Sequence, residues 1–215
     1  VLAIKAGREL VNLQLIGEDG SKRFLTGGQV KGASLVLGGK LAGADEAILC
    51  EGWATGLSLR AATGLPVIVA FNAGNLPVIS ERLFTSLPEM ALIVAGDTDT
   101  SQTGQQAAQK AALAHGKARW YCPVFTPEQV SQHQQKHGKA PSDFNDLHQL
   151  VGLEEVARQI GEAKEVEPAE LVKSGVSDGG TTQTEDELIA GLAVLPVIQY
   201  ERRRAGAAEA LGIRA

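Results

Sequence analysis

Residues 47–56 read Ala-Ile-Leu-Cys-Glu-Gly-Trp-Ala-Thr-Gly, and residues 91–99 read Ala-Leu-Ile-Val-Ala-Gly-Asp-Thr-Asp. In both stretches an apolar run ends abruptly at acidic residues. A continuous apolar run is typical of a strand buried on both faces of a parallel sheet. Ligands of open α/β sheets bind at the carboxyl ends of such strands. We therefore expect Glu51, Asp97 and Asp99 to lie close together at one edge of a sheet.

A divalent cation is the expected partner of these three side chains. Carboxylates that share a site repel one another, which raises their pKa values unless a cation lies between them. Mg²⁺ prefers oxygen ligands, so we expect Mg²⁺ as the cofactor, with Mn²⁺ as an alternative. Asp97 and Asp99 are alternate residues of an extended segment and can therefore face the same ion. Simpler interpretations stay open: Glu51 could be a favourable charge at a helix N-terminus, and Asp99 could cap the next helix.

A third acidic segment, Ser-Asp-Phe-Asn-Asp-Leu, occupies residues 142–147. Asp143 and Asp146 are candidates for further metal ligands at the same edge of the sheet. The alternative is that Ser142 or Asp143 caps the helix that follows, because Ser and Asp are favoured at that position. The sequence leaves both interpretations open.

Apolar runs alternate with helical segments from residue 46 onward. Strands are expected at 47–50, 66–71, 90–95 and 117–124, and helices at 54–63, 75–87, 101–115, 128–138 and 143–163. Strands that alternate with helices across short connections predict a parallel sheet with helices packed on it, joined by right-handed crossovers. The predicted fold class is therefore α/β.

The segment before residue 46 has a different pattern. Residues 11–15 alternate between apolar and polar side chains, as a half-exposed strand does, and glycine-rich turns follow. We predict a small antiparallel β meander over residues 1–37. The expected organisation is an N-terminal β-rich subdomain at 1–45, a catalytic domain at 46–163, a polar linker at 164–185 and a short helical connector to a further domain at 186–215.

Composition favours an ordinary globular domain with a limited role for charge. The 215 residues are 44% hydrophobic and 21% charged, with a formal net charge of −5. This negative net charge argues against a generally basic surface for binding polyanions. A local basic groove is still compatible with it, because binding depends on the local electrostatic field. Four basic residues gather in the N-terminal segment: Lys22, Arg23, Lys31 and Lys40. They are candidate phosphate contacts for nucleic acid or nucleotides, or else charges on a solvated sheet face.

The missing motifs exclude several kinds of site. Cys50 and Cys122 form no Cys-x-x-Cys pair and lie in apolar runs, so we expect reduced core cysteines and no zinc ribbon. His133 and His137 share one helix face, but their Gln and Lys neighbours favour a solvated face over a zinc site. The sequence has no Walker A loop, dinucleotide-binding glycine turn or hydrolase nucleophile elbow. It also has no 18-residue apolar run or signal peptide, so we expect a cytoplasmic location and no membrane association.

The acidic motifs together resemble the Toprim domain of topoisomerases and primases. Glu-Gly-Trp-Ala-Thr-Gly at 51–56 is similar to the Glu-Gly-Tyr-Ala-Thr-Ala signature of primases from satellite phages and plasmids. Asp97-x-Asp99 follows about 45 residues later, as in that domain. Three further segments resemble stretches of mobile-element primase-helicases, namely residues 22–32, 63–76 and 143–148. The resemblance as a whole covers roughly residues 8–163.

Some positions depart from the family pattern. Trp53 replaces the usual Tyr, and Thr55 stands where bacterial replicative primases have an aspartate. The zinc-binding module that often precedes such domains is missing, whereas residues 197–215 resemble the connector to the helicase that often follows. Since Val1 opens inside a strand-like pattern, we interpret the chain as a piece of a longer protein.

The resemblance implies a Toprim-like fold and a primase-type nucleotidyl transferase. Glu51 would be the general acid or base, and Asp97 and Asp99 would hold Mg²⁺ while ribonucleoside triphosphates are joined into an RNA primer on single-stranded DNA. A helicase domain of the longer protein would be a partner. Two other functions stay open: a metal-dependent nuclease that uses the same carboxylates, and a non-catalytic Toprim module that binds nucleic acid or a helicase.

Overall fold

Two sheets organise the part of the chain that the computed structural model describes, which is residues 1–99 and 102–166. The chain divides into two compact units, Val1–Pro168 and Ala169–Ala215, and every described element belongs to the first. The helical connector predicted at 186–215 lies outside the described residues. So does nearly all of the linker predicted at 164–185.

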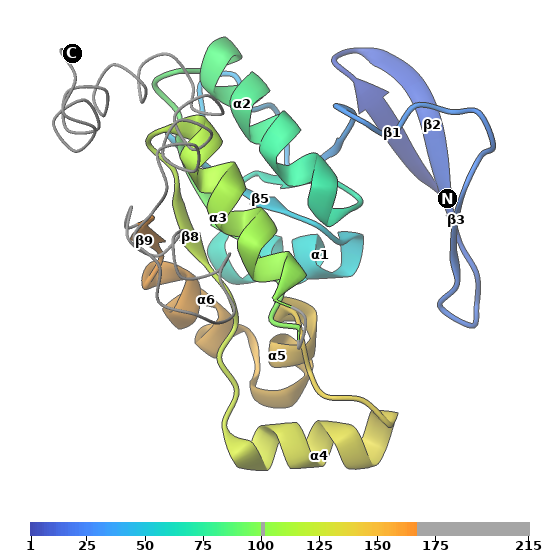
Figure 1. Cartoon of the computed structure of the whole chain (residues 1–215), viewed down its shortest axis with the longest axis vertical. Helices are drawn as coiled ribbons and strands as arrows, with labels where there is room; N and C mark the ends of the chain where they lie inside the picture. The colour runs from blue at the N-terminus through green and yellow to red at the C-terminus, as the bar shows by residue number, and fades with distance from the viewer. Residues whose placement is uncertain (100–101, 167–215) are drawn as a thin grey trace, which may run out of the picture. The chain divides into compact units, whose positions relative to one another are not determined.

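The larger sheet has six strands in the order β4-β6-β5-β7-β8-β9 (Figure 1). The four central strands are parallel, and the edge strands β4 and β9 run antiparallel to their neighbours. The bounds are β4 Leu35–Leu37, β5 Glu46–Cys50, β6 Val67–Val69, β7 Ala91–Ala95, β8 Arg119–Tyr121 and β9 Lys164–Glu165. The predicted α/β class is confirmed. The short strand β9 occupies the first residues of the predicted linker.

Helices cover both faces of this sheet. They are α1 Trp53–Thr63, α2 Leu76–Ser86, α3 Thr103–His115, α4 Pro127–His137, α5 Phe144–Val151 and α6 Leu153–Gly161, with a 3-10 turn at Ala73–Asn75. Helices α2 and α3 pack on one face, and α1, α5 and α6 pack on the other (Figure 1). Ala47 and Leu49 of β5 contribute to the first core, whereas Ile48 and Cys50 contribute to the second. Alternate side chains of a strand point to opposite faces, so a strand covered on both sides must be apolar throughout.

Local residues determine where the helices begin and end. Helix α1 ends at Gly64, whose φ of 72° is left-handed. Helix α4 begins with a capping box between Thr126 and Gln129. The single helix predicted over 143–163 was wrong, because Gly152, with a φ of 92°, separates α5 from α6. A residue with positive φ cannot continue a right-handed helix.

The smaller sheet is an antiparallel meander of β1 Leu2–Ala6, β2 Glu9–Ile16 and β3 Lys22–Phe24. The predicted meander over 1–37 is therefore only partly correct. Strand β4 leaves it and pairs with β6 of the larger sheet. The reason is apolar burial: Val36 packs against one core of the larger sheet, and Leu35 and Leu37 pack against the other.

A buried asparagine joins the N-terminal segment to the larger sheet. Asn75 is 2% exposed and accepts a hydrogen bond from the Gly32 N–H at 2.7 Å. Its amide nitrogen lies 2.8–3.1 Å from three main-chain carbonyl oxygens, those of Val30, Ala33 and Ala70. Lys5 and Ser34 add two main-chain hydrogen bonds of 2.9 Å. Loss of the asparagine would leave buried main-chain groups unpaired, which is costly.

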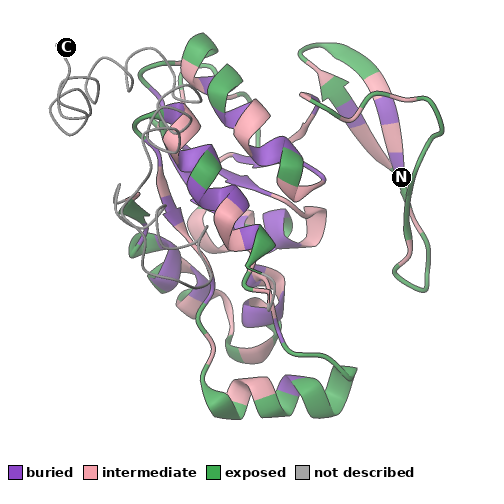
Figure 2. Ribbon diagram, viewed as in Figure 1, coloured by how far each residue is buried: buried purple, intermediate pink, exposed green. Residues whose placement is uncertain are grey.

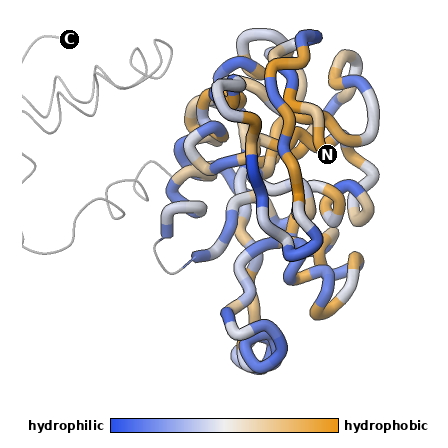
Figure 3. The backbone as a smooth tube through the Cα atoms, turned by 90° about the vertical axis from the view of Figure 1, so that its right-hand side faces the viewer, coloured by the Kyte–Doolittle hydropathy of each residue, from blue (hydrophilic) through white to orange (hydrophobic). Residues whose placement is uncertain are grey.

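Buried residues concentrate in the central strands and in the helix faces turned toward them (Figure 2). Helix α4 differs: it is hydrophilic, as its blue end-on view shows (Figure 3), and its only buried residue is His133. Within the described ranges, no helix has the length and apolar character needed to cross a membrane.

Candidate active site

The carboxyl ends of β5 and β7 lie side by side at one edge of the larger sheet. The two strands pair in register, with Cys50 opposite Ala95. Glu51 follows Cys50 directly, and Asp97 follows Ala95 by two residues, so both acidic residues reach the same edge. Adjacent parallel strands necessarily end on the same side, which is why the sequence pattern could predict this arrangement. We call the acidic residues gathered here the carboxylate edge: Glu51, Asp97, Asp99 and Asp143.

Close packing holds Asp97 against the start of α3. A Cβ added to Gly104 would lie 2.7 Å from the Asp97 carbonyl oxygen, and one added to Gly96 would lie 2.6 Å from the Ala108 Cβ. The two glycines therefore allow the helix to approach the strand end. Oδ1 of Asp97 is buried and has no hydrogen-bond partner among the described residues. A buried carboxylate oxygen without a partner is costly unless a ligand satisfies it.

At the carboxylate edge, burial and repulsion between neighbouring carboxylates raise the pKa values of acidic side chains. The pKa of Asp97 is raised to about 8, and burial is the largest cause. Neighbouring carboxylates add to this effect: Asp143, Glu51, Asp99 and Asp146. Burial likewise raises the pKa of Glu51, while the ammonium group of Lys22 acts in the opposite direction. A cation bound at this edge would reverse the repulsion that raises both pKa values.

Asp99 has a structural role in addition to its place at the edge. Its Oδ1 accepts a hydrogen bond from the Thr103 N–H at 3.0 Å, and its Oδ2 accepts one from the Gly104 N–H at 3.1 Å. It therefore satisfies main-chain donors in the first turn of α3, although the N-cap residue is Gln102 and the prediction that Asp99 itself is the cap was wrong. The two roles are compatible, because an ionised carboxylate can accept more than two hydrogen bonds or a metal ion.

Asp143 and Asp146 form the turn that begins α5. Asp143 is the N-cap: its Oδ1 accepts from the Asp146 N–H at 2.8 Å, and its Oδ2 accepts from the Thr55 hydroxyl at 3.1 Å. Asp146 Oδ2 accepts from the Ser142 N–H at 2.9 Å, and its Oδ1 lies 3.3 Å from His133 Nε2. Both oxygens of Asp146 thus stabilise the turn. Asp143 uses one oxygen for the turn and turns the other toward α1 at the carboxylate edge.

His133 differs from its sequence-based interpretation. A solvated face was expected for His133 and His137, yet His133 is only 3% exposed. Its Nδ1 lies 2.8 Å from the Lys139 carbonyl oxygen, and its Nε2 faces Asp146. The ring centroids of the two histidines are 4.5 Å apart. His133 therefore connects α4 to the turn before α5. The polar sequence of α4 did not reveal this role, because the partners of His133 lie 6 and 13 residues further along the chain.

The side chains as placed do not form a closed metal site. Within residues 1–99 and 102–166, no group of three His, Cys, Asp or Glu side chains could hold a metal ion. The donor set still suits a hard cation, because it consists of carboxylates and includes the unpaired Asp97 oxygen. The carboxylate edge therefore has the charge that a cation would bind, without the ligand geometry of a formed site.

The four candidate basic residues lie on different parts of the N-terminal segment. Lys22 and Arg23 are consecutive on β3, so they point to opposite faces of the smaller sheet. Lys22 is the one whose charge reaches Glu51. Lys31 and Lys40 lie in exposed positions before and after β4, and neither is among the charges that shift the pKa of Glu51 or Asp97.

The two cysteines lie beneath the carboxylate edge. Both are free thiols, Cys50 buried and Cys122 half-buried. Burial, with the negative charges of Asp97 and Asp99, raises the pKa of Cys122 to about 12. Burial also raises the pKa of Cys50. Neither thiol ionises near neutral pH, which fits the predicted core role.

The chain is similar in sequence to known proteins. Residues 46–154 match the family described as the Toprim domain. The chain is 31% identical over 177 residues to a protein named DNA primase TraC from Escherichia coli, and 30% identical over 141 residues to a second protein of that name. These alignments cover 78% and 61% of the chain but only 17% and 10% of the relatives. The chain thus spans a small part of their length.

A solved structure shares the fold. It is the crystal structure of the primase fragment of the bacteriophage T7 primase-helicase protein, with a TM-score of 0.51 and 16% sequence identity. The match covers 74% of the chain and 60% of that fragment. At this identity, the similarity shows a shared fold alone.

Proposed function

The chain belongs to the Toprim domain family, and we propose that it is the catalytic core of a DNA primase. In this proposal it joins ribonucleotides from their triphosphates into an RNA primer on single-stranded DNA. The similarity to two Escherichia coli proteins named DNA primase supports the assignment. Because the chain spans a small part of those proteins, this activity and its partners are proposals for the protein that contains the domain.

The observation that carries the proposal is the register of β5 and β7. It brings Glu51 and Asp97 to one edge of the sheet, from segments 46 residues apart in the sequence. Nucleotidyl transfer needs a group that moves a proton and a set of carboxylates that can hold a divalent cation. The carboxylate edge offers both kinds of group within electrostatic reach of one another.

Glu51 is the proposed general acid or base. Its raised pKa brings the carboxyl group closer to the pH at which the enzyme would operate, which favours proton exchange. It would accept the proton of the primer 3′-hydroxyl as that oxygen attacks the α-phosphorus, while pyrophosphate leaves. The positive charge of Lys22 would lower the pKa of Glu51 and so oppose the effect of burial.

Mg²⁺ is the proposed cofactor, with Mn²⁺ as an alternative. Asp97 and Asp99 would hold it, and Asp143 and Asp146 would support the same edge. The unpaired Oδ1 of Asp97 supports this role most directly. When bound, the ion would neutralise the triphosphate charge and that of the leaving pyrophosphate.

The proposed partners follow from the same assignment. Lys22, Arg23, Lys31 and Lys40 are proposed contacts for the phosphates of single-stranded DNA or nucleotides. The N-terminal subdomain (1–45) would present these residues to the catalytic domain (46–163). We also propose that the linker (164–185) and connector (186–215) lead toward a helicase, and that the protein acts in the cytoplasm.

A dinucleotide-extension assay tests the proposal. The protein that contains the domain is incubated with a single-stranded DNA template, a labelled dinucleotide, ribonucleoside triphosphates and Mg²⁺ or Mn²⁺. Extension of the dinucleotide that is lost in Glu51→Gln supports the primase. Shortening of the template instead of extension supports the metal-dependent nuclease, and binding without either reaction supports the non-catalytic module.

A further inference from the structure

An exposed aromatic ring lies on the smaller sheet, against a second ring from the larger one. Phe24 of β3 is 38% exposed, and Phe71 is 8% exposed. Their ring centroids are 6.2 Å apart at an interplanar angle of 86°, so one ring meets the other edge to face. This arrangement is favourable for aromatic pairs and fixes the orientation of the exposed ring.

The supporting ring belongs to a strained residue next to the proposed general acid or base. Phe71 has a φ of 70°, in the left-handed region that bulky residues rarely adopt. Its N–H donates a hydrogen bond to the Glu51 carbonyl oxygen at 2.8 Å. Backbone strain of this kind persists only where the surroundings enforce it, and it concentrates at functional sites. The position of the Phe24 ring is thus connected, through Phe71, to the backbone of Glu51.

The pleat of β3 places a positive charge beside the exposed ring. Lys22 and Phe24 are two residues apart, so they share one face of the strand. That face is the one turned toward the carboxylate edge, because Phe24 contacts Phe71 and the charge of Lys22 reaches Glu51. Asn75 holds residues 30–33, which follow β3, to the larger sheet with buried hydrogen bonds, and the contact between Phe24 and Phe71 is a second point of attachment.

We propose that Phe24, supported by Phe71, stacks against a base of single-stranded nucleic acid and so positions it beside the carboxylate edge. This inference rests on the proposed function. An exposed aromatic ring next to a cation matches the two parts of a single strand, which are the flat base and the charged phosphate. A duplex does not fit, because its bases already stack on one another. In this arrangement Lys22 contacts a phosphate adjacent to the stacked base.

A binding experiment without metal tests the stacking role separately from catalysis. Fluorescence anisotropy, in EDTA, measures binding of the full chain to labelled single-stranded DNA and to the same strand with abasic sites. The variants are Phe24→Leu, which keeps an apolar side chain but removes the aromatic face, and Phe24→Tyr, which keeps the face. The matched control is Leu15→Ala: Leu15 is 39% exposed and pairs with Arg23, so it lies on the opposite face of the same sheet.

The expected result has a specific pattern. Phe24→Leu weakens binding to the normal strand by about 5- to 150-fold, the range for removal of one base-stacking aromatic ring, and leaves binding to the abasic strand unchanged. Phe24→Tyr and Leu15→Ala bind both strands as the unchanged protein does. Lys22→Gln weakens binding to both strands and reduces the slope of log K against log salt by about 0.7.

Other patterns would overturn the inference. If Phe24→Leu binds the normal strand as well as the unchanged protein does, Phe24 is only a packing residue. If it weakens both strands equally, or if Leu15→Ala has the same effect, the loss comes from the sheet as a whole. The assay does not depend on primer synthesis. Stacking can therefore fail while Glu51→Gln still abolishes extension, and extension can fail while the dependence on Phe24 holds.

Discussion

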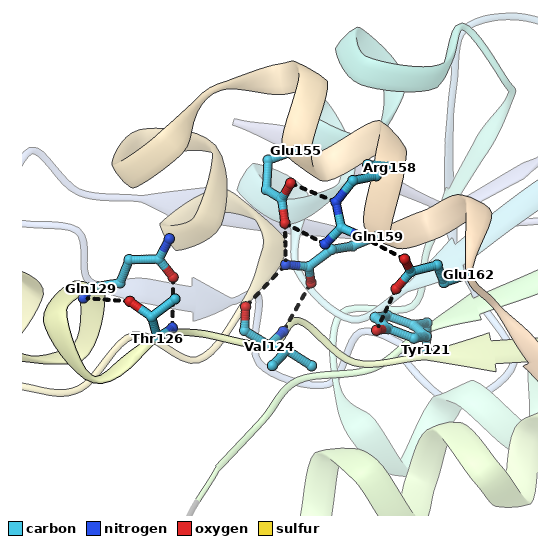
Figure 4. A network of polar contacts seen from close by, with 8 residues as sticks. All are labelled: Tyr121, Val124, Thr126, Gln129, Glu155, Arg158, Gln159 and Glu162. Atoms are coloured by element: carbon cyan, nitrogen blue, oxygen red, sulfur yellow. Dashed lines mark hydrogen bonds and ion pairs between the residues drawn. The ribbon is translucent and has the colours of Figure 1, made fainter.

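Acidic residues gather at the carboxylate edge and again on α6, but their surroundings are opposite. On α6, Arg158 donates hydrogen bonds to Glu155 and to Glu162, and Gln159 bonds to both Glu155 and the main chain of Val124 (Figure 4). We call this group the α6 network. At the carboxylate edge, no ion pair links Glu51, Asp97 or Asp143 to a cationic side chain among the described residues.

The pKa values follow this difference. Hydrogen bonds from Arg158 and Gln159 lower the pKa of Glu155 to about 2, whereas burial and like charges raise that of Asp97 to about 8. In the α6 network, Arg158 forms ion pairs with both carboxylates, Glu155 and Glu162. At the carboxylate edge, every cause that shifts the pKa of Asp97 raises it, and a bound cation would offset this repulsion. The direction of a carboxylate's pKa shift therefore helps to distinguish a structural cluster from a candidate site.

The largest expected difference between the two regions concerns catalysis. Glu51→Gln keeps the size of the side chain but removes proton transfer, so we expect the rate of dinucleotide extension to fall by about 10²- to 10⁴-fold. Glu155→Gln, the same chemical change in the α6 network, should leave the rate unchanged. Equal rates in the two variants would remove the functional distinction between the regions.

A second difference concerns the response to metal. Asp97→Asn removes a buried carboxylate that its neighbours repel, so the metal-free variant should melt at a higher temperature, by about 2–4 °C for each kcal/mol gained. It should also lose most of the stabilisation that Mg²⁺ gives the unchanged protein, and any residual activity should need more Mg²⁺. Differential scanning calorimetry with and without Mg²⁺ measures these effects. A matched Glu162→Gln variant should respond to Mg²⁺ normally, and a metal-free Asp97→Asn that melts lower would contradict the account.

His115 shows the effect of burial on a pKa in the absence of repulsion between carboxylates. It is fully buried against Phe84, and neither ring nitrogen has a hydrogen-bond partner among the described residues. Burial, with a smaller contribution from Lys117, lowers its pKa from 6.5. The unfolded chain therefore takes up a proton at a higher pH than the folded protein does, so stability is lost as the pH falls below about 6.5.

The corresponding prediction compares melting temperatures across pH. His115→Leu, which replaces the ring with an apolar side chain, should reduce the loss of stability between neutral pH and pH 5. This change in melting temperature should be smaller than the change caused by Asp97→Asn, because His115 titrates without a cluster of like charges around it. An identical pH dependence in His115→Leu and the unchanged protein would mean that this histidine does not titrate on folding.

The smallest effect is expected in the α6 network itself. Arg158 is exposed, and exposed ion pairs contribute little because water and salt screen them. Arg158→Gln should change the melting temperature less than Asp97→Asn or His115→Leu, and high salt should remove the difference. A large loss of stability would show that the network is structural in a way that its exposure does not suggest.

Strands β5–β8 and the positions of Glu51 and Asp97 could be predicted from the sequence. A strand buried on both faces has to be apolar throughout, and such a run of consecutive apolar residues can be recognised in the sequence. The motifs around Glu51 and Asp97 also identified the family, which residues 46–154 confirm. The strand β4 and the break at Gly152 were not predicted, because short apolar or helical segments do not show which partner they will pack against.

The sequence by itself therefore determined the α/β class, the acidic strand ends and the family, since each depends on residues close together in the chain. The tertiary structure alone decided what those residues have as neighbours. It brought Lys22 toward Glu51, Phe24 onto Phe71 and His133 onto Asp146. These pairs are separated by 13 to 47 residues, and they meet because the packing of the smaller sheet and of α4 fixes distances that no local pattern contains.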